Sequence, residues 1–297
     1  MSGTQTVPFN FGALPPGECL WEKSRVVFLP VPYDLTTTYL PGARRGPLAI
    51  LEASTHMELF DEELEMETFR IGLHTFAFLE AVASSPEEMV RQVQRFSEPV
   101  VRANKFPVLL GGEHTVTIGV ARSLKEKYPA LSFLQLDAHA DLRDSYEGTH
   151  FSHACVGRRL ADLGPLVQVG VRSLSTEEHH YLQNAPVKSF SPHRFPDPAG
   201  WEEKVCQALS KEVYVTIDLD VFDPAVMPSV GTPEPGGLHW KAVTRLLRRV
   251  AREKAVVGFD VVELAPIPYL AAPDFLAAKL IYRFLGYIFA SSLGKET

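Results

Sequence analysis

Short runs of apolar residues alternate with segments of helical periodicity along most of the chain. The runs are rich in β-branched residues, as in VYVTI at 213–217, which is typical of buried strands. The predicted strands cover residues 25–29, 107–110, 131–136, 166–171, 213–217 and 256–259. Continuous apolar strands separated by helices predict a parallel sheet that is covered by helices on both faces.

The helical segments show apolar residues spaced three or four positions apart. The predicted helices cover residues 47–60, 86–103, 115–127, 176–182 and 240–252, and a closing helix begins at 273. Pro47 suits a first helical turn, and Ser85 with Glu88 forms a capping-box pattern. Because no Ser/Gly linker divides the chain, residues 25–297 are predicted to form one three-layer α/β domain after an irregular arm, residues 1–24.

Composition and charge exclude several classes of protein. The 297 residues include 29 Lys and Arg against 36 Asp and Glu, a net charge of −7. This balance argues against a nucleic-acid partner, because phosphate binding needs clustered basic residues. The cysteines, Cys19, Cys155 and Cys206, form no CxxC pair, so neither a disulfide framework nor a zinc–thiolate site is expected. Since the start does not resemble a secretory signal, the chain is predicted to be cytoplasmic.

The longest apolar stretch covers residues 269–290 and is interrupted by Asp274, Lys279 and Arg283. These charges favour a buried amphipathic helix over a membrane-spanning helix. No membrane partner is therefore expected.

Polar side chains follow four predicted strands at the point where each strand ends. They lie in Gly-Gly-Glu-His at 111–114, Asp-Ala-His-Ala-Asp at 137–141, Asp-Leu-Asp at 218–220 and Asp-Val-Val-Glu at 260–263. Ligands of open parallel sheets bind at these carboxyl ends. Alternate residues of an extended segment point the same way, so Asp137, His139 and Asp141 are expected to face one point. Asp-Leu-Asp alone is more typical of a turn or a helix cap, and a lone histidine at a strand end is more typical of a hydrogen-bonded core residue. Asp-x-His-x-Asp is rarer and fits a metal site as well as a structural one, and the three motifs together favour a metal site.

Carboxylate and imidazole ligands suit hard to borderline divalent cations such as Mn²⁺. The four aspartates Asp137, Asp141, Asp218 and Asp220 bring four negative charges, which two divalent cations would balance. A single cation would leave the site over-negative. The sequence therefore predicts a hydrolytic binuclear site, with carboxylates bridging cations about 3.5–4 Å apart.

At these residues the sequence resembles the ureohydrolase family, which includes the arginases and agmatinases. The resemblance extends from about residue 31 to residue 263 and also includes GTPEPGG at 231–237. The segments at 32–34 and 41–47 resemble the first active-site loop of the family. Glu113 stands where many members have Asp, and we interpret it as a tolerated neighbour of His114.

The resemblance implies an arginase-like fold and two Mn²⁺ ions per chain. The implied ligands are His114 and Asp141 on one ion, His139 and Asp220 on the other, and Asp137 and Asp218 as bridges. A hydroxide between the ions would attack the guanidinium carbon, which neutral water attacks too slowly.

The resemblance assigns protonation of the leaving amine to His153, whose imidazole side chain titrates near neutral pH. His150, on the same loop, is the alternative, and either could be a solvated loop histidine. Glu263 is expected to hold the guanidinium by paired, charge-assisted hydrogen bonds. Its alternative is a structural ion pair with a nearby arginine.

The segment after the aspartates bears on which guanidino compound is bound. Arginases carry Asn two residues after the last aspartate of the Asp-x-His-x-Asp motif, where this chain has Arg143. The following loop resembles that of agmatinases, in which Asp144 or Glu147 could attract the free amine and Tyr146 could pack on its methylenes. Arg143 could instead pair with a carboxylate substrate, although an internal ion pair is favoured.

We therefore predict Mn²⁺-dependent hydrolysis of agmatine to putrescine and urea, a reaction of polyamine biosynthesis. Aminopropylagmatine, guanidinobutyrate, formimidoylglutamate and arginine remain alternative substrates. A non-catalytic metal- or polyamine-binding protein is the alternative from a different class, and the complete ligand set with His153 and Glu263 argues against it. The resemblance also implies a homo-oligomer, either a trimer or a hexamer.

Overall fold

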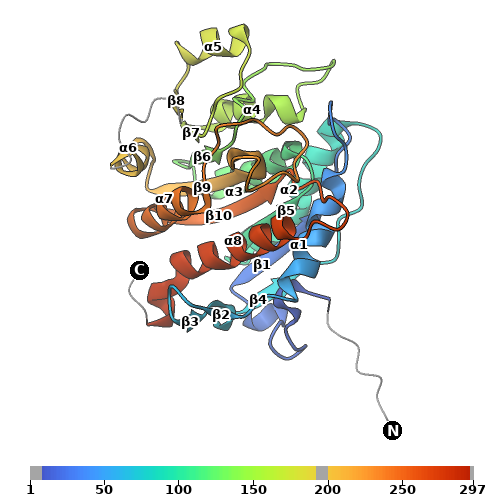
Figure 1. Ribbon diagram of the computed structural model, residues 1–297, viewed down its shortest axis with the longest axis vertical. Coiled ribbons are helices and arrows are strands. Elements are labelled where there is room, and N and C mark those ends of the chain that lie inside the picture. Colours follow the sequence, from blue (N-terminus) through green and yellow to red (C-terminus); the bar gives the residue numbers. More distant parts are fainter. Residues whose placement is uncertain (1–8, 192–199, 295–297) are drawn as a thin grey trace.

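The computed structural model describes residues 9–191 and 200–294 (Figure 1). Within these residues, the centre is an eight-stranded parallel sheet in the order β4-β1-β5-β10-β9-β6-β7-β8. Its strands are β1 Val26–Val31, β4 Leu73–Thr75, β5 Phe106–Gly111, β6 Ser132–Leu136, β7 Leu166–Val169, β8 Val187–Phe190, β9 Glu212–Asp218 and β10 Ala255–Val262. A separate antiparallel hairpin pairs β2 Phe60–Asp61 with β3 Met66–Glu67.

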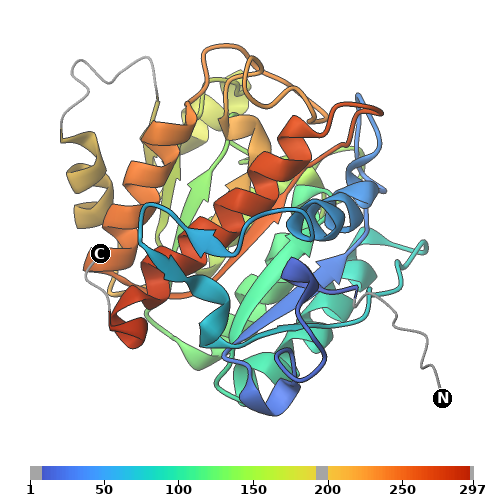
Figure 2. The ribbon, with the colours of Figure 1, turned by 60° about the horizontal axis from the view of Figure 1, so that its bottom comes forward.

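Helices cover both faces of the sheet, which confirms the predicted three-layer α/β domain. One face carries α1 Gly46–Ser54, α6 Trp201–Ala208, α7 Trp240–Glu253 and α8 Ala272–Phe289. The other face carries α2 Pro86–Arg102, α3 Thr117–Lys127 and α4 Val156–Leu163, and α5 Thr176–Leu182 lies beside β8. Figure 2 shows α8 crossing the sheet between α7 and α1.

Alternate residues of each central strand pack into one of two cores. In β1, Val26 and Phe28 face the side of α8, whereas Val27 and Leu29 face the side of α2. Every residue of β1 is buried, because helices cover both sides of the strand. Burial on both faces explains why a continuous apolar run marked this strand in the sequence.

β1 continues through Pro30 to Val31, although the sequence predicted that it ends at Pro30. The carbonyl of Pro30 accepts a hydrogen bond of 3.0 Å from the backbone N–H of Leu79, on the side of β4. Since β4 has already ended at Thr75, the missing N–H of Pro30 breaks no bond of the ladder.

α1 ends at Ser54, earlier than the predicted end at residue 60, and a turn then leads into the β2–β3 hairpin. The segment 272–293 is long and apolar enough to cross a membrane, but 67% of its most apolar window is buried inside the fold. α8 is therefore a core helix, as its interrupting charges predicted. Its Arg283 pairs with Asp61 at 2.5 Å.

Residues 9–24 of the predicted arm contain two short 3₁₀ turns, Phe11–Ala13 and Trp21–Lys23. The side chain of Phe11 is fully buried and stacks on Phe28, with ring centroids 4.3 Å apart. This stretch therefore packs on the domain. Residues 1–8 of the arm lie outside the described residues.

Candidate active site

The carboxyl ends of β5, β10, β9 and β6 are neighbours in the sheet. His114 follows β5, Glu263 follows β10, Asp218 ends β9 and Asp137 follows β6. Because all of these strands are parallel, the four motifs converge on one edge of the sheet, as the sequence predicted.

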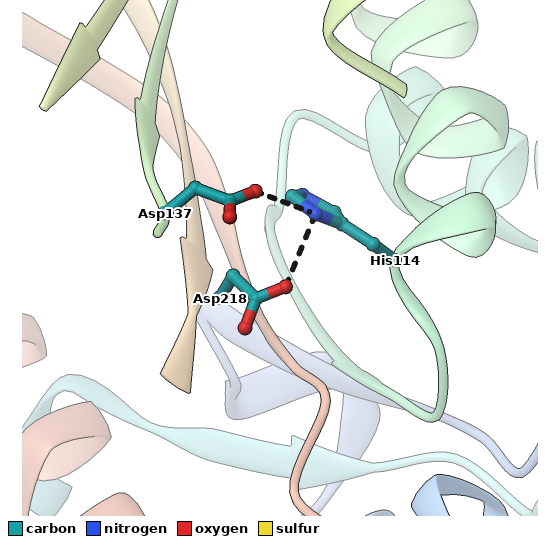
Figure 3. A group of neighbouring side chains, drawn as sticks. All are labelled: His114, Asp137 and Asp218. Atoms are coloured by element: carbon teal, nitrogen blue, oxygen red, sulfur yellow. Dashed lines mark ion pairs between the residues drawn. The ribbon is translucent and has the colours of Figure 1, made fainter. Parts of the chain in front are cut away.

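His114 lies among three carboxylates. Its Nδ1 atom is 3.1 Å from Asp137 Oδ2, 3.3 Å from Asp141 Oδ2 and 3.4 Å from Asp218 Oδ2. Figure 3 shows this ring pointing between Asp137 and Asp218, which come from two adjacent strands. The Nδ1 atom is buried, and no residue in the described part of the chain forms a hydrogen bond with it.

A hydroxyl–carboxylate pair fixes the other ring nitrogen of His114. His114 Nε2 lies 2.8 Å from Thr216 Oγ1, and that hydroxyl donates to Asp260 Oδ1 at 2.6 Å. Because the Thr216 proton is already donated, Thr216 accepts from Nε2–H. With its hydrogen on Nε2, this ring in its neutral form carries the lone pair on Nδ1, toward the three carboxylates, which is the arrangement of a metal-binding histidine.

A second group surrounds His139. Its Nδ1 atom lies 2.8 Å from Asp220 Oδ2 and 3.7 Å from Asp137 Oδ1. Asp137 therefore belongs both to this group and to the group formed with His114 and Asp218, and the donor atoms of each group lie within 4.8 Å of one another. The shared carboxylate is what a pair of bridged cations requires.

The backbone separates the ligands of the Asp-x-His-x-Asp motif. Asp141 has a left-handed backbone with φ of +53°, so the motif is not extended throughout as predicted. Its carboxylate consequently turns toward His114, while His139 turns toward Asp220. Such strain in a non-glycine residue persists where the surrounding structure enforces it, as at functional sites.

The electrostatics of these groups indicate a need for positive charge. Burial raises the pKa of Asp141 to about 7, and the charge of Asp137 adds to this effect. Burial and neighbouring acids also raise the pKa of Asp218 well above its usual range. Burial lowers the pKa of His114, but the adjacent carboxylates outweigh it and raise that pKa well above the usual range. The donor set therefore fits divalent cations, which would supply the charge directly.

Glu263 lies beside these groups, on a left-handed backbone with φ of +67°. Its Oε1 atom accepts a 2.6 Å hydrogen bond from the backbone N–H of His114, which leaves Oε2 for a ligand. Burial raises the pKa of this carboxyl group to about 8, and Glu113 contributes to the shift.

A cavity of about 300 Å³ opens over this edge of the sheet. The predicted residues that line it are His114, His139, Asp141, Arg143, Tyr146, His153, Asp218, Asp220 and Glu263. Asp137 is completely buried beside them.

The structure distinguishes between the two candidate proton-transfer histidines. His153 lines the cavity, and burial together with the nearby His139 and His114 lowers its pKa to about 4. His150 is not among the lining residues, and its side chain is 57% exposed. Its Nδ1 atom contacts the backbone carbonyl of Asp144 instead, at 2.7 Å.

The predicted substrate loop reaches the cavity only in part. The guanidinium of Arg143 lies 4.9 Å above the ring of Tyr146, and its Nε atom is 4.0 Å from Glu178 Oε2. Asp144 and Glu147 do not line the cavity, and Asp144 pairs with Arg159 at 2.6 Å. The structure therefore does not place these two acids where a substrate amine would lie.

Glu178 is the acid in the cavity wall that the sequence did not reveal. It is 4% exposed, and its two oxygens accept from the backbone N–H groups of Leu142 at 2.9 Å and Ser175 at 2.7 Å. The spacing from Ser175 to Glu178 is a capping-box pattern, which the structure also forms at the start of α5. That pattern gave no indication of a second role.

The model of the Arginase family matches residues 24–286. The chain belongs to the arginase family. It is 42% identical over 267 residues to the N(1)-aminopropylagmatine ureohydrolase of Thermus thermophilus, covering 90% of this chain and 91% of that relative. It is 33% identical over 262 residues to the agmatinase of Pyrococcus horikoshii, covering 88% and 90%.

Solved structures of the arginase family share this fold. The agmatine ureohydrolase of Thermoplasma volcanium superposes with a TM-score of 0.83 at 31% identity, covering 91% of this chain and 92% of that one. The resemblance noted in the sequence is thereby confirmed, and the chain is a hydrolase of this family.

Proposed function

We propose that this arginase-family hydrolase cleaves the guanidino group of N1-aminopropylagmatine to urea and a triamine. The 42% identity to an aminopropylagmatine ureohydrolase over 90% of the chain carries this proposal. Agmatine, which the sequence favoured, becomes the second candidate, since the agmatinase relative is 33% identical. Both substrates present the same guanidinium to the same end of the cavity.

The residues around the two histidine–aspartate groups have separable tasks at the guanidinium. Divalent cations bound there, which we propose to be Mn²⁺, would supply Lewis-acid chemistry and activate water. Glu263 would hold the guanidinium through Oε2, because its other oxygen is bound to the His114 backbone. His153 would take up the proton that the attacking water loses and pass it to the leaving amine, since it is the remaining histidine in the cavity wall.

The far end of the substrate would lie along Tyr146 and Glu178. Apart from the proposed metal ligands and Glu263, Glu178 is the acid among the residues that line the cavity. Its carboxylate contacts Arg143 only at 4.0 Å, so an ammonium group of the substrate could replace that weak contact. The α-carboxylate of arginine would instead meet this acid at close range, which is unfavourable.

A panel of substrates tests the proposal. We expect kcat/KM for aminopropylagmatine to exceed that for agmatine, and to exceed that for arginine by on the order of 10²-fold or more. Urea release should be measured with Mn²⁺-loaded protein on these three compounds and on guanidinobutyrate, and formamide release on formimidoylglutamate. Preference for guanidinobutyrate would indicate that Arg143 binds the carboxylate of the substrate. Absence of turnover on all five compounds would favour a non-catalytic binding protein.

The number of metal ions bound per chain tests whether Asp137 is shared by two metal sites. Wild-type protein should hold close to two Mn²⁺ per chain, and Asp137→Asn should lose both ions, because Asp137 belongs to both groups. His139→Ala should lose one ion, because its contacts lie in one group. Elemental analysis after dialysis distinguishes these outcomes, and a single ion in wild-type protein would contradict the binuclear site.

We further propose that the enzyme works in the cytoplasm as a homo-oligomer on a small cationic substrate, with no nucleic-acid or membrane partner. The three free cysteines and the net charge of −7 support this setting.

A further inference from the structure

Glu113 is a completely buried carboxylate that stands outside both candidate metal groups. Thr36, a residue of a distant loop, bonds both oxygens of Glu113, and the Thr115 hydroxyl is a further hydrogen-bond partner of this carboxylate. Oε1 accepts from the Thr36 hydroxyl at 2.7 Å, and Oε2 accepts from the Thr36 backbone N–H at 2.7 Å. A buried carboxylate with such specific partners is more than a tolerated neighbour of His114.

The Thr36 hydroxyl also contacts His153. It lies 3.2 Å from His153 Nδ1 and accepts from the His153 backbone N–H at 3.1 Å. Its distance to the Thr115 hydroxyl is longer, at 3.4 Å. Three separate segments of the chain, which contribute Glu113, Thr36 and His153, therefore meet through one hydroxyl group.

The direction of these hydrogen bonds determines the protonation of the ring. A hydroxyl has one proton, and Thr36 donates its proton to Glu113. Toward Nδ1 of His153, Thr36 can then only accept, so Nδ1 must carry the hydrogen. In a neutral imidazole this leaves the lone pair on Nε2, which is free of this contact and available to the cavity that His153 lines.

We infer that Glu113 and Thr36 are positioning residues for the reaction: they hold His153 as the Nδ1–H tautomer, so that Nε2 can take up the proton released by the attacking water and pass it to the leaving amine. The inference rests on the proton-transfer role proposed above for His153. Ser152 also lies near the ring, with Oγ 3.3 Å from Nδ1, but none of its hydrogen bonds reaches Glu113. It therefore serves as a comparison.

Variants of Thr36 test the inference in the Mn²⁺-loaded enzyme. Thr36→Val should lower kcat by about 10- to 100-fold with little change in KM or metal content, a loss of the size seen when a metal-binding histidine loses its outer hydrogen-bond partner. Thr36→Ser keeps the hydroxyl and should restore most of the activity. Ser152→Ala should cost less than Thr36→Val, because it leaves the link to Glu113 intact.

A double-mutant cycle separates positioning from general structural damage. If Thr36 acts through His153, Thr36→Val should cause no further loss of kcat in a His153→Ala background. Equal losses in both backgrounds would overturn the inference. Full activity of Thr36→Val beside an impaired His153→Ala would also overturn it, while leaving the proposed function intact.

A measurement that does not depend on enzymatic turnover tests the tautomer of His153 directly. Histidine ¹⁵N resonances of Zn²⁺-loaded, diamagnetic protein report the tautomer of His153. We expect the Nδ1–H form in the wild type and a loss of that preference in Thr36→Val. An Nε2–H form in the wild type would refute the positioning role whatever the substrate is.

Discussion

At the scale of single residues, two histidines of this site each contact a threonine hydroxyl that is hydrogen-bonded to a buried carboxylate. The two contacts place the ring hydrogen on different nitrogen atoms. Thr216 donates to Asp260 and so keeps the hydrogen of His114 on Nε2, which aims Nδ1 at the aspartates. Thr36 donates to Glu113 and would keep the hydrogen of His153 on Nδ1. A hydroxyl committed to a buried carboxylate thus selects the tautomer that each histidine needs for its task.

His153 and His150 give the first prediction, because the loop carries both. His153→Ala should lower kcat by about 10²- to 10⁴-fold, the usual contribution of a general acid–base group, without loss of metal. His150→Ala should stay near wild-type activity, since its ring is exposed and bonded to the carbonyl of Asp144. Steady-state urea release with parallel elemental analysis checks both, and the reverse ranking would transfer the role to His150.

At the scale of elements, the metal groups could be predicted because strand ends carry a regular signal. Apolar runs located β5, β6 and β9, and the carboxyl ends of adjacent parallel strands meet at one edge. His114, Asp137 and Asp218 therefore came together as expected. The edge strands β4 and β8 were missed because they are short, and the two central residues of β8 are exposed, so neither shows a continuous apolar run.

Contacts between loops had no such signal. Thr36 lies 77 residues from Glu113 and 117 from His153, and no periodicity relates positions that far apart. The capping-box spacing from Ser175 to Glu178 is typical of a helix start, and it gives no sign that Glu178 also lies in the cavity wall. Asp144 and Glu147, which were expected near the substrate, do not line the cavity, because loop sequence does not reveal which side chains turn inward.

Arg283 of α8 gives a prediction about how the β2–β3 hairpin is held. It is 3% exposed and pairs with Asp61 at 2.5 Å, Glu62 at 2.6 Å and Glu63 at 2.5 Å. Arg283→Met should lower the free energy of unfolding by about 3–5 kcal/mol, because it leaves the buried Asp61 without a counter-charge. Arg248→Met removes a partly exposed pair with Glu63 and should cost no more than about 1 kcal/mol.

Urea unfolding at one fixed protein concentration compares these two variants. Equal midpoints for Arg283→Met and wild-type protein would show that the hairpin is held by its apolar contacts alone.

Asp274, in the first turn of α8, gives a prediction about pH. Burial, with a contribution from Glu52, raises its pKa to about 6, and its Oδ1 atom is buried without a hydrogen-bond partner in the described chain. An acid whose folded pKa is raised favours folding while it is protonated, so this contribution is lost as pH rises from about 4 to 6. Asp274→Asn should therefore unfold at higher urea than wild type at pH 7, by on the order of 1 kcal/mol after solvent screening.

The difference between Asp274→Asn and wild type should shrink as the pH falls toward 4. A constant difference across that range would show that the change acts through packing and not through ionisation.

At the scale of the whole molecule, large apolar side chains are exposed beside the mouth of the cavity. Tyr39 and Leu40 line the cavity and are also exposed, and the loop after β10 exposes Ile267 and Tyr269. The two loops approach each other where Gly42 lies against Ala265. Tyr269 is completely exposed on a left-handed backbone with φ of +66°. Several large apolar side chains exposed on two neighbouring loops are typical of an interaction surface.

We expect this surface to be covered in a homo-oligomer of three or six chains. Light scattering should then give a mass of three or six chains at working concentration, and Tyr269→Glu should shift the population toward smaller species, because it places a charge in an apolar contact. Leu20→Glu changes an exposed apolar residue before β1, at the opposite end of the strands, and should leave the mass unchanged. A wild-type monomer would show that the apolar mouth is solvent-exposed in the working enzyme, while the chemistry of the cavity would be unaffected, since the described chain contributes every site residue named here.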